Sequence, residues 1–244
     1  MPVCNVPSPI LITGAARSGT SMVAGIVNIC GAWGGKLFPA NQYNPKGMFE
    51  SVGVRGLIKA YLRKIQVDPR GQFPLPDTTR MEIPITWKKS VETVLETDGY
   101  PGGPWFCKEP KMCLIWPVWH FAFPTAKWVI VRRKTPDIVN SCLKTSFMRA
   151  FTNPATQRVI KAHNTAEGWK WWVHEHENRF REIIDAGLDV RVVWPERMVD
   201  GDYEQMQELI TWLGLQWKDG QVKEFIEPKL WKARMWKQQN NMEK

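Results

Sequence analysis

Long apolar runs, internal repeats, low-complexity tracts and paired cysteines are all missing from this sequence. No stretch is apolar for long enough to span a membrane, and Arg17 interrupts the most apolar N-terminal stretch. The cysteines are odd in number and include no CxxC pair: Cys4, Cys30, Cys107, Cys113 and Cys142. This pattern gives no support for a disulfide framework. It indicates reduced thiols, mostly buried as small apolar residues.

Residues 1–10 carry no basic segment of the kind that opens a secretory signal. We therefore expect no signal peptide, and together with the unpaired cysteines this predicts a cytoplasmic protein. The chain has 244 residues, of which 43% are hydrophobic and 23% charged, so it is long enough for one sizeable globular domain or two small ones. The 14 tryptophans are unusual, and we expect most of them in the core or in a pocket wall.

Acidic residues are also in short supply. There are 24 Asp and Glu residues against 33 Lys and Arg residues, which gives a formal net charge of +9. Such a surplus suits an anionic ligand, which it attracts and then stabilises. A nucleic acid is a weaker prediction because the cations are spread along the chain and no recognition motif accompanies them.

A glycine-bounded loop near the N-terminus has the context of a phosphate-binding site. Residues 14–21 read G-A-A-R-S-G-T-S, follow an apolar strand expected at 10–13 and lead into a helix expected at about 18–30. A strand, loop and helix in this order present backbone N–H groups and a helix N-terminus to an anion. An ordinary tight turn that binds nothing is the alternative.

One residue separates this loop from a Walker A motif. The spacing of Gly14, Gly19 and Ser21 fits G-x-x-x-x-G-K-[ST], but Thr20 stands at the lysine position. An NTPase needs that lysine on the β- and γ-phosphates. Arg17 supplies a cation from inside the loop instead, so the pattern indicates a nucleotide whose role is not γ-phosphoryl transfer.

A second anion site is predicted at another strand end. Three consecutive cations follow the buried strand expected at 127–131: Arg132, Arg133 and Lys134. A helix expected at 136–145, with Thr135 as its N-cap, begins at once, and Ser141 lies one turn into it. Ligands of open parallel sheets bind at such strand ends. A ligand with two separated phosphate groups would explain both sites, whereas a solvated basic turn would explain only this one.

The remaining periodicity predicts an α/β fold. Further strands are expected at 105–108 and 190–194, and further helices at 52–65, 83–96, 112–121 with Pro117 inside, 154–186 and 203–213. Strands that are apolar on both faces and alternate with helices argue for a parallel sheet covered by helices. We therefore expect a single three-layer domain with a central, mostly parallel sheet flanked by helices.

At these residues the chain resembles the PAPS-dependent sulfotransferase family, in which PAPS is 3′-phosphoadenosine 5′-phosphosulfate. Residues 16–21 look like the family's 5′-phosphosulfate loop, and the spacing Arg133, Asp137, Ser141 looks like its 3′-phosphate motif R-x-x-x-D-x-x-x-S. Residues 44–50, N-P-K-G-M-F-E, resemble the N-P-K-G-Y-F-E segment of many bacterial members. Residues 108–111, K-E-P-K, resemble K-D-P-R.

The late motifs extend this resemblance over roughly residues 8–216. The stretch 192–198 with Asp202 looks like the family's late strand and E-x-L element, and Gly214 closes a W-L-G-L end. Residues 217–244 would then form a basic, aromatic C-terminal tail. The stretch 229–237 in it is expected to be an amphipathic surface helix, with closure over the nucleotide or the acceptor as the alternative.

The resemblance implies transfer of a sulfuryl group from PAPS to an acceptor hydroxyl or amine by in-line displacement, with release of 3′,5′-adenosine bisphosphate (PAP). It implies that the 5′-phosphosulfate is held by Ala16, Arg17, Ser18, Gly19, Thr20 and Ser21. Ser141 and either Arg132 or Arg133 would hold the 3′-phosphate, because the turn after the strand departs from the family by one residue. Lys108 would neutralise the charge that develops on the bridging oxygen. A small-molecule or glycan acceptor and no metal are expected, and the oligomeric state stays open.

Two glutamates are candidates for the base that removes the acceptor proton. Glu50 is the first choice because glutamate serves at this place in several family branches, although it could instead be a charge at a helix N-terminus. Glu109 is the second choice and could equally form an ion pair with Lys108 or Lys111. Pro110 stands where the aryl and steroid members carry their histidine base.

Other functions are kept as alternatives. A P-loop kinase or NTPase is disfavoured by Thr20, and a catalytically inactive nucleotide-binding scaffold is disfavoured by the presence of Arg17, Lys108 and Glu50. His174 and His176 suggest a metal site, but residues two apart on a helix do not share a face.

Overall fold

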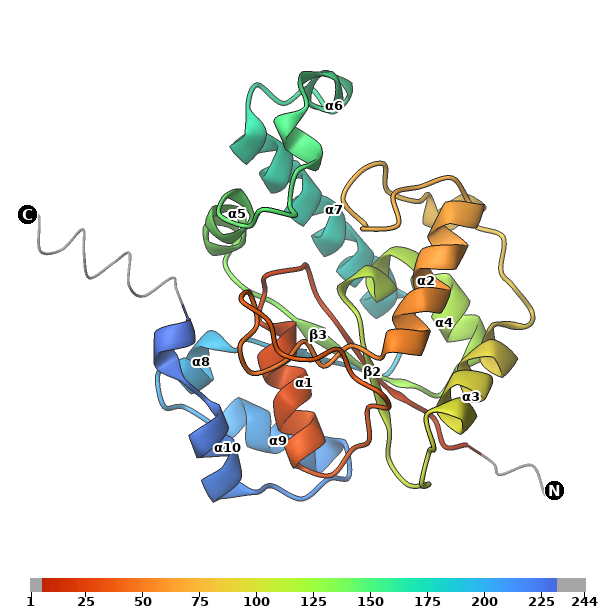
Figure 1. Ribbon diagram of the computed structural model, residues 1–244, viewed down its shortest axis with the longest axis vertical. Coiled ribbons are helices and arrows are strands. Elements are labelled where there is room, and N and C mark those ends of the chain that lie inside the picture. The colour runs from red at the N-terminus through yellow and green to blue at the C-terminus, as the bar shows by residue number, and fades with distance from the viewer. Residues whose placement is uncertain (1–5, 232–244) are drawn as a thin grey trace, which may run out of the picture.

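The computed structural model describes residues 6–231 and contains a four-stranded sheet. Its strands are β1 (Ile10–Thr13), β2 (Phe106–Lys108), β3 (Lys127–Val131) and β4 (Val190–Val193). They lie in the order β2-β1-β3-β4, and every neighbouring pair is parallel. The expected α/β architecture with a parallel sheet is therefore confirmed, and each expected strand is present (Figure 1).

Ten α-helices surround this sheet within the described residues. They are α1 (Thr20–Ile29), α2 (Val52–Lys64), α3 (Trp87–Thr97), α4 (Trp116–Ala122), α5 (Thr135–Leu143), α6 (Pro154–Val159), α7 (Thr165–Asp185), α8 (Glu196–Val199), α9 (Glu204–Trp212) and α10 (Asp219–Phe225). None of the described helices combines the length and the apolar character that a membrane span needs.

The alternating side chains of the central strands build two separate cores. On one face, Leu11 of β1 and Ile130 of β3 pack with α2, α3, α4 and α7. On the other face, Ile12 of β1 and Val129 of β3 pack with α1, α8, α9 and α10 (Figure 1). Successive residues of a strand point to opposite faces, so a strand that is apolar throughout requires cover on both sides. The result is the expected three-layer arrangement.

Tryptophans and cysteines lie largely where the sequence predicts. Five tryptophans are among the largest fully buried side chains: Trp105, Trp119, Trp128, Trp169 and Trp172. The four described cysteines are free thiols in the interior, and Cys4 lies outside the described residues.

The helix expected at 112–121 with an internal proline is wrong. Residues Pro110–Ile115 form a 3₁₀ helix, and α4 starts only at Trp116, so that Pro117 stands in its first turn. Proline has no backbone N–H and is tolerated where a helix begins, because the first N–H groups have no partner inside the helix.

The long helix expected at 154–186 is also wrong, because it divides into α6 and α7. Lys161, between them, has a φ of 56°, and Asn164 caps α7 by accepting a hydrogen bond of 2.9 Å from the backbone N–H of Glu167. An asparagine at this place satisfies an otherwise unpaired N–H and starts a new helix. The cap expected at Thr135 is likewise absent: Thr135 is the first residue of α5, and Lys134 stands at the N-cap position.

The beginning of the expected C-terminal tail packs on the sheet. Val222 of α10 and Ile226 are buried in the core that contains α1. The expected amphipathic helix at 229–237 lies mostly outside the described residues, where only a 3₁₀ turn over Pro228–Leu230 and the buried Trp231 can be placed.

Candidate functional site

A cavity of about 1130 Å³ lies where the carboxyl ends of β1, β2 and β3 meet the loops that follow them. Pockets for small ligands usually measure roughly 300–1,000 Å³, so this one is slightly larger than the usual range. The predicted site residues that line it are Ala16, Arg17, Gly19, Thr20, Ser21, Glu50, Lys108, Arg133 and Ser141. Ser18 and Arg132 are the two predicted residues that do not.

The loop after β1 has the conformation of an anion cradle. Arg17 and Gly19 both have positive φ angles, 74° and 99°, and α1 starts directly afterwards at Thr20. The first turn of α1 carries no acidic side chain, so the positive end of its dipole is not compensated. This geometry directs backbone N–H groups and a helix N-terminus toward the cavity.

Gly14 is required by close packing. A Cβ atom at Gly14 would lie 2.5 Å from the backbone oxygen of Val131 and 2.8 Å from Oγ of Ser18. Ser18 itself is fully buried, and its hydroxyl finds no hydrogen-bond partner among residues 6–231. Its backbone N–H already donates a hydrogen bond of 3.1 Å to the backbone oxygen of Ala15, and Ser18 does not line the cavity.

Two contacts join the two predicted anion sites. The Nε of Arg17 donates a hydrogen bond of 2.9 Å to Oγ of Ser141, and Nη1 of Arg133 donates one of 3.0 Å to the backbone oxygen of Arg17. Burial lowers the pKa of Arg17 from its usual value. Both sites therefore belong to one cavity.

Arg132 and Arg133 lie on opposite sides of the strand end. Arg133 lines the cavity, with its guanidinium 4.1 Å from the ring centroid of Trp231 and 4.0 Å from a carboxylate oxygen of Asp137. Arg132 forms an ion pair with Glu177 instead and lies over Trp194. Of the two arginines that the sequence left open, only Arg133 faces the same space as the loop.

Lys108 is the centre of a buried polar network. Its Nζ donates to Oε1 of Glu50 at 2.8 Å, to the backbone oxygen of Met48 at 3.1 Å and to Oγ of Ser21 at 3.2 Å. Lys108 thus extends from β2 to the first turn of α1, where the lysine of a Walker A loop is missing.

Glu50 is held between two cations. Besides Lys108, it contacts Nη1 of Arg55 at 3.2 Å. Burial by itself would raise the pKa of Glu50, but the charges of Lys108, Lys111 and Arg55 and the hydrogen bond from Lys108 together lower it below its usual value. The carboxyl group is therefore ionised at neutral pH and can accept a proton.

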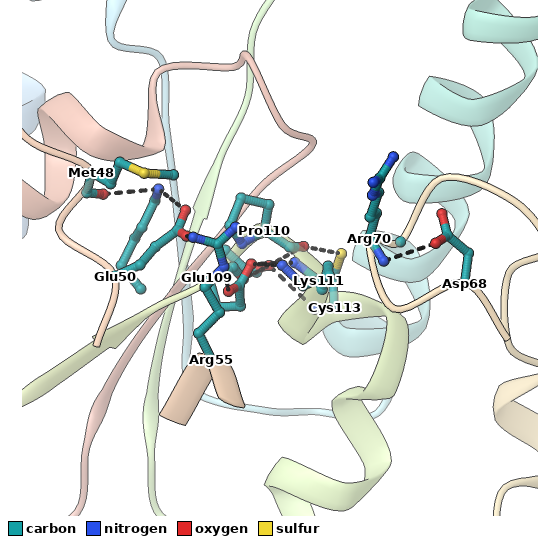
Figure 2. A network of polar contacts seen from close by, with 12 residues as sticks. Met48, Glu50, Arg55, Asp68, Arg70, Glu109, Pro110, Lys111 and Cys113 are labelled. Atoms are coloured by element: carbon teal, nitrogen blue, oxygen red, sulfur yellow. Dashed lines mark hydrogen bonds and ion pairs between the residues drawn. The ribbon is translucent and has the colours of Figure 1, made fainter. Parts of the chain in front are cut away.

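Glu109 has a more rigid environment. Its carboxylate pairs with Lys111 and also accepts the backbone N–H of that residue, and Arg55 lies 4.0 Å away (Figure 2). It lines the cavity and is buried. The ion pair with Lys111 that the sequence offered as an alternative is thus present.

Sequence reasoning missed several cations of the cavity wall, among them Arg55, Lys59 and Arg70. Arg55 and Lys59 are four residues apart in α2 and so share a face of it. That spacing was visible in the sequence, but which face points to the cavity was not. Arg70 lies in a long loop and gave no local signal.

The histidine pair does not form a joint site. His174 is exposed, whereas His176 is buried and its Nδ1 lies 2.8 Å from the backbone oxygen of Trp172. Burial lowers the pKa of His176 to about 4, so it is uncharged. Among the described residues, no three His, Cys, Asp or Glu side chains gather closely enough to hold a metal ion.

Comparison with solved structures finds bacterial sulfotransferases. STF9 from Mycobacterium avium is 13% identical with a TM-score of 0.49, and the alignment covers 94% of this chain and 68% of that one. The sulfotransferase domain from the curacin biosynthetic pathway is 12% identical (TM-score 0.49; 92% and 77% covered). STF1 from Mycobacterium tuberculosis H37Rv is 13% identical (TM-score 0.43; 94% and 76% covered). No curated protein sequence matches the chain.

The family comparison is the more informative one. The model of the sulfotransferase family matches residues 9–219, which is well over half of the chain. The matched region includes the loop after β1, the Lys108 network and the strand end with Arg133, all of which border the cavity. The chain therefore belongs to the sulfotransferase family.

Proposed function

We propose that this protein transfers a sulfuryl group from PAPS to a hydroxyl or amine group of a small-molecule or glycan acceptor and releases PAP. The observation that carries the proposal is the contact of two anion-binding strand ends in a single cavity, through Arg133 and the backbone of Arg17. A donor with phosphate groups at both its 3′ and 5′ positions fits this pair of sites.

The donor's two ends are assigned to different elements. The backbone of residues 19–21 and the side chain of Arg17 bind the 5′-phosphosulfate, and Arg133 and Ser141 bind the 3′-phosphate. Supporting this, Arg133 is buried beside Trp231 and lines the cavity, so its charge is available to a ligand with little competition from water.

Lys108 and Glu50 are assigned the chemical step. Bound PAPS supplies an activated sulfuryl group whose departure leaves negative charge on the bridging oxygen. Lys108, within 3.2 Å of the Ser21 hydroxyl, is placed to neutralise that charge. Glu50, within 2.8 Å of Lys108, accepts the proton of the acceptor.

The two roles support each other. While Lys108 pairs with Glu50, the carboxylate is stabilised and is a weak base. As Lys108 turns toward the leaving oxygen, Glu50 loses its nearest positive charge and its affinity for a proton rises. Arg17, Lys108 and Arg133 supply the cations, so the charge neutralisation is assigned to side chains.

A thermal-shift titration tests the proposal against a kinase or NTPase. We expect PAP without metal to raise the melting temperature, since a ligand at about 100 times its Kd stabilises by roughly 2.7 kcal/mol. ATP with Mg²⁺ should stabilise much less. The opposite preference would refute the sulfotransferase assignment, and no response to either ligand would favour an inactive scaffold.

A further inference from the structure

A second group of cations lines the cavity beyond the phosphate loop. It consists of Arg55, Lys59, Arg70 and Lys111, which we call the acceptor-side cations. Contacts run from Ser21 through Lys108 and Glu50 to Arg55, so this group lies on the far side of the proposed reaction centre from the loop.

Three of the acceptor-side cations are close enough to act on one another, and the loop of the fourth packs against them. Lys59 is influenced electrostatically by both Arg55 and Lys111. Gly71, next to Arg70, packs so tightly on Lys111 that a Cβ atom there would lie 2.6 Å from Cγ of that lysine. One wall of the cavity thus receives positive charges from three segments: helix α2, the 3₁₀ helix Pro110–Ile115 and the loop around Gly71.

Two of these charges have no ion-pair or hydrogen-bond partner among residues 6–231, although Glu109 acts on Lys59 electrostatically from farther away. Arg55 and Lys111 are compensated by Glu50 and Glu109, as described above. Within residues 6–231, no carboxylate lies within 4.0 Å of the Lys59 ammonium or the Arg70 guanidinium, and neither group donates a hydrogen bond. Over the whole cavity, nine Lys and Arg side chains face four Asp and Glu side chains, so the wall keeps an excess of positive charge that the local carboxylates do not neutralise.

The loop that carries Arg70 is fixed in place. The carboxylate of Asp68 accepts the backbone N–H of Arg70 (Figure 2) and also that of Gln72, each at 2.9 Å. Trp172 donates a hydrogen bond of 2.8 Å to the backbone oxygen of Gly71. The Gln72 side chain is itself buried and binds three backbone groups of residues 147–150. The backbone of this loop is thus held in place, and the exposed side chain of Arg70 borders the cavity.

We propose that the acceptor carries an anionic oxygen group, such as a carboxylate, and that Lys59, Arg70 and Lys111 bind it. This rests on the proposed function, because it takes the Lys108 and Glu50 pair as the place where the acceptor hydroxyl or amine reacts. The planar guanidinium of Arg70 suits a carboxylate, which it can hold with two parallel hydrogen bonds.

Matched pairs of probes test the charge requirement. One pair is 4-hydroxybenzoate and its methyl ester, and the other is glucuronate and glucose. Binding of each probe to the PAP-saturated protein is measured by calorimetry, and sulfuryl transfer from PAPS is measured with the same probes. We expect the carboxylate member of at least one pair to bind about 10–100-fold more tightly, as a charge-assisted hydrogen bond predicts.

Variants assign the preference to the named side chains. Lys59→Ala and Arg70→Ala should each remove most of that preference and leave PAP affinity unchanged. Lys64→Ala is the matched control, because it removes one positive charge from the same helix at an exposed position outside the cavity lining. It should keep the preference. Lys59→Arg should retain it as well.

The outcomes separate the two proposals. Failure of PAP to bind would refute the proposed function. If PAP binds but the charged and neutral members of each pair bind equally well, the proposal of an anionic acceptor is overturned and the proposed function is not. The same holds if PAP binds and neither carboxylate does. A preference that persists in both Lys59→Ala and Arg70→Ala would also overturn it, since the charge would then be recognised elsewhere.

Discussion

The guanidinium of Arg133 donates a hydrogen bond to the backbone oxygen of Arg17 at 3.0 Å, across 116 residues of sequence. This contact holds the end of β3 against the loop after β1. Each segment alone is an ordinary strand end with positive charge. Together they form one binding surface, with Trp231 packed over Arg133 and beside Gly19.

Replacement of the two adjacent arginines should have unequal effects on PAP affinity. Arg133→Ala removes a buried cation that faces the cavity, and we expect a loss of about 10–100-fold, as for one hydrogen bond to a charged group. Arg132→Ala removes a half-exposed ion pair with Glu177 and should change PAP affinity little. Calorimetric titration of both variants with PAP makes the comparison. Equal losses would contradict the assignment of Arg133 to the 3′-phosphate.

Lys108→Ala should lower kcat much more than it weakens PAP binding. The proposed contact with the bridging oxygen gains strength only as the bond breaks, and loss of one such donor typically costs about 10²–10³-fold in kcat. Steady-state kinetics with PAPS and separate PAP titrations distinguish the two effects. A tenfold or smaller fall in kcat would argue against Lys108 as the group on the leaving oxygen. Lys46→Ala, at an exposed cavity-lining lysine, is the control.

Glu50→Gln should abolish the proposed proton transfer while it keeps the shape of the side chain. We expect kcat to fall by about 10²–10⁴-fold, the usual contribution of a positioned base. In the free protein the charges of Lys108, Lys111 and Arg55 outweigh burial and lower the pKa of Glu50, so the wild-type kcat/KM should stay constant from neutral pH downward and fall only below the usual glutamate range. Rates of Glu109→Gln provide the comparison. A larger effect of Glu109→Gln than of Glu50→Gln would transfer the role of base to Glu109.

The same carboxyl group should make stability depend on pH. The pKa of Glu50 is lower in the folded protein than in the unfolded chain, where it is about 4.3, so folding favours the ionised form. Its contribution is therefore complete above the unfolded pKa and is lost as the pH falls through the folded pKa. Chemical denaturation at pH values from 7 down to 3 should show a steeper loss of unfolding free energy for the wild type than for Glu50→Gln. Parallel curves would show that the ion pairs add no net stability.

Local patterns determined much of the fold from sequence alone. Residues 10–13 and 127–131 are apolar on both faces, and such strands can lie only inside a parallel sheet covered twice. The spacing of Gly14 and Gly19 indicated the loop, because close backbone approach and a positive φ both favour glycine. Where prediction failed, as at Pro117 and Asn164, a single residue that starts a helix interrupted an otherwise continuous pattern.

The tertiary structure alone decided which charges share the cavity. Arg132 and Arg133 are neighbouring arginines that the sequence does not distinguish. Their side chains point to opposite sides of the strand end. Arg133 faces the cavity because it contacts Arg17 and Trp231. The spacing of Arg55 and Lys59 on one helix was visible in the sequence, but nothing local linked Lys59 to Arg70. Both residues line the cavity because the core positions helix α2 and the hydrogen bonds of Asp68 position the loop of Arg70. Such long-range contacts leave no pattern in the local spacing of residues.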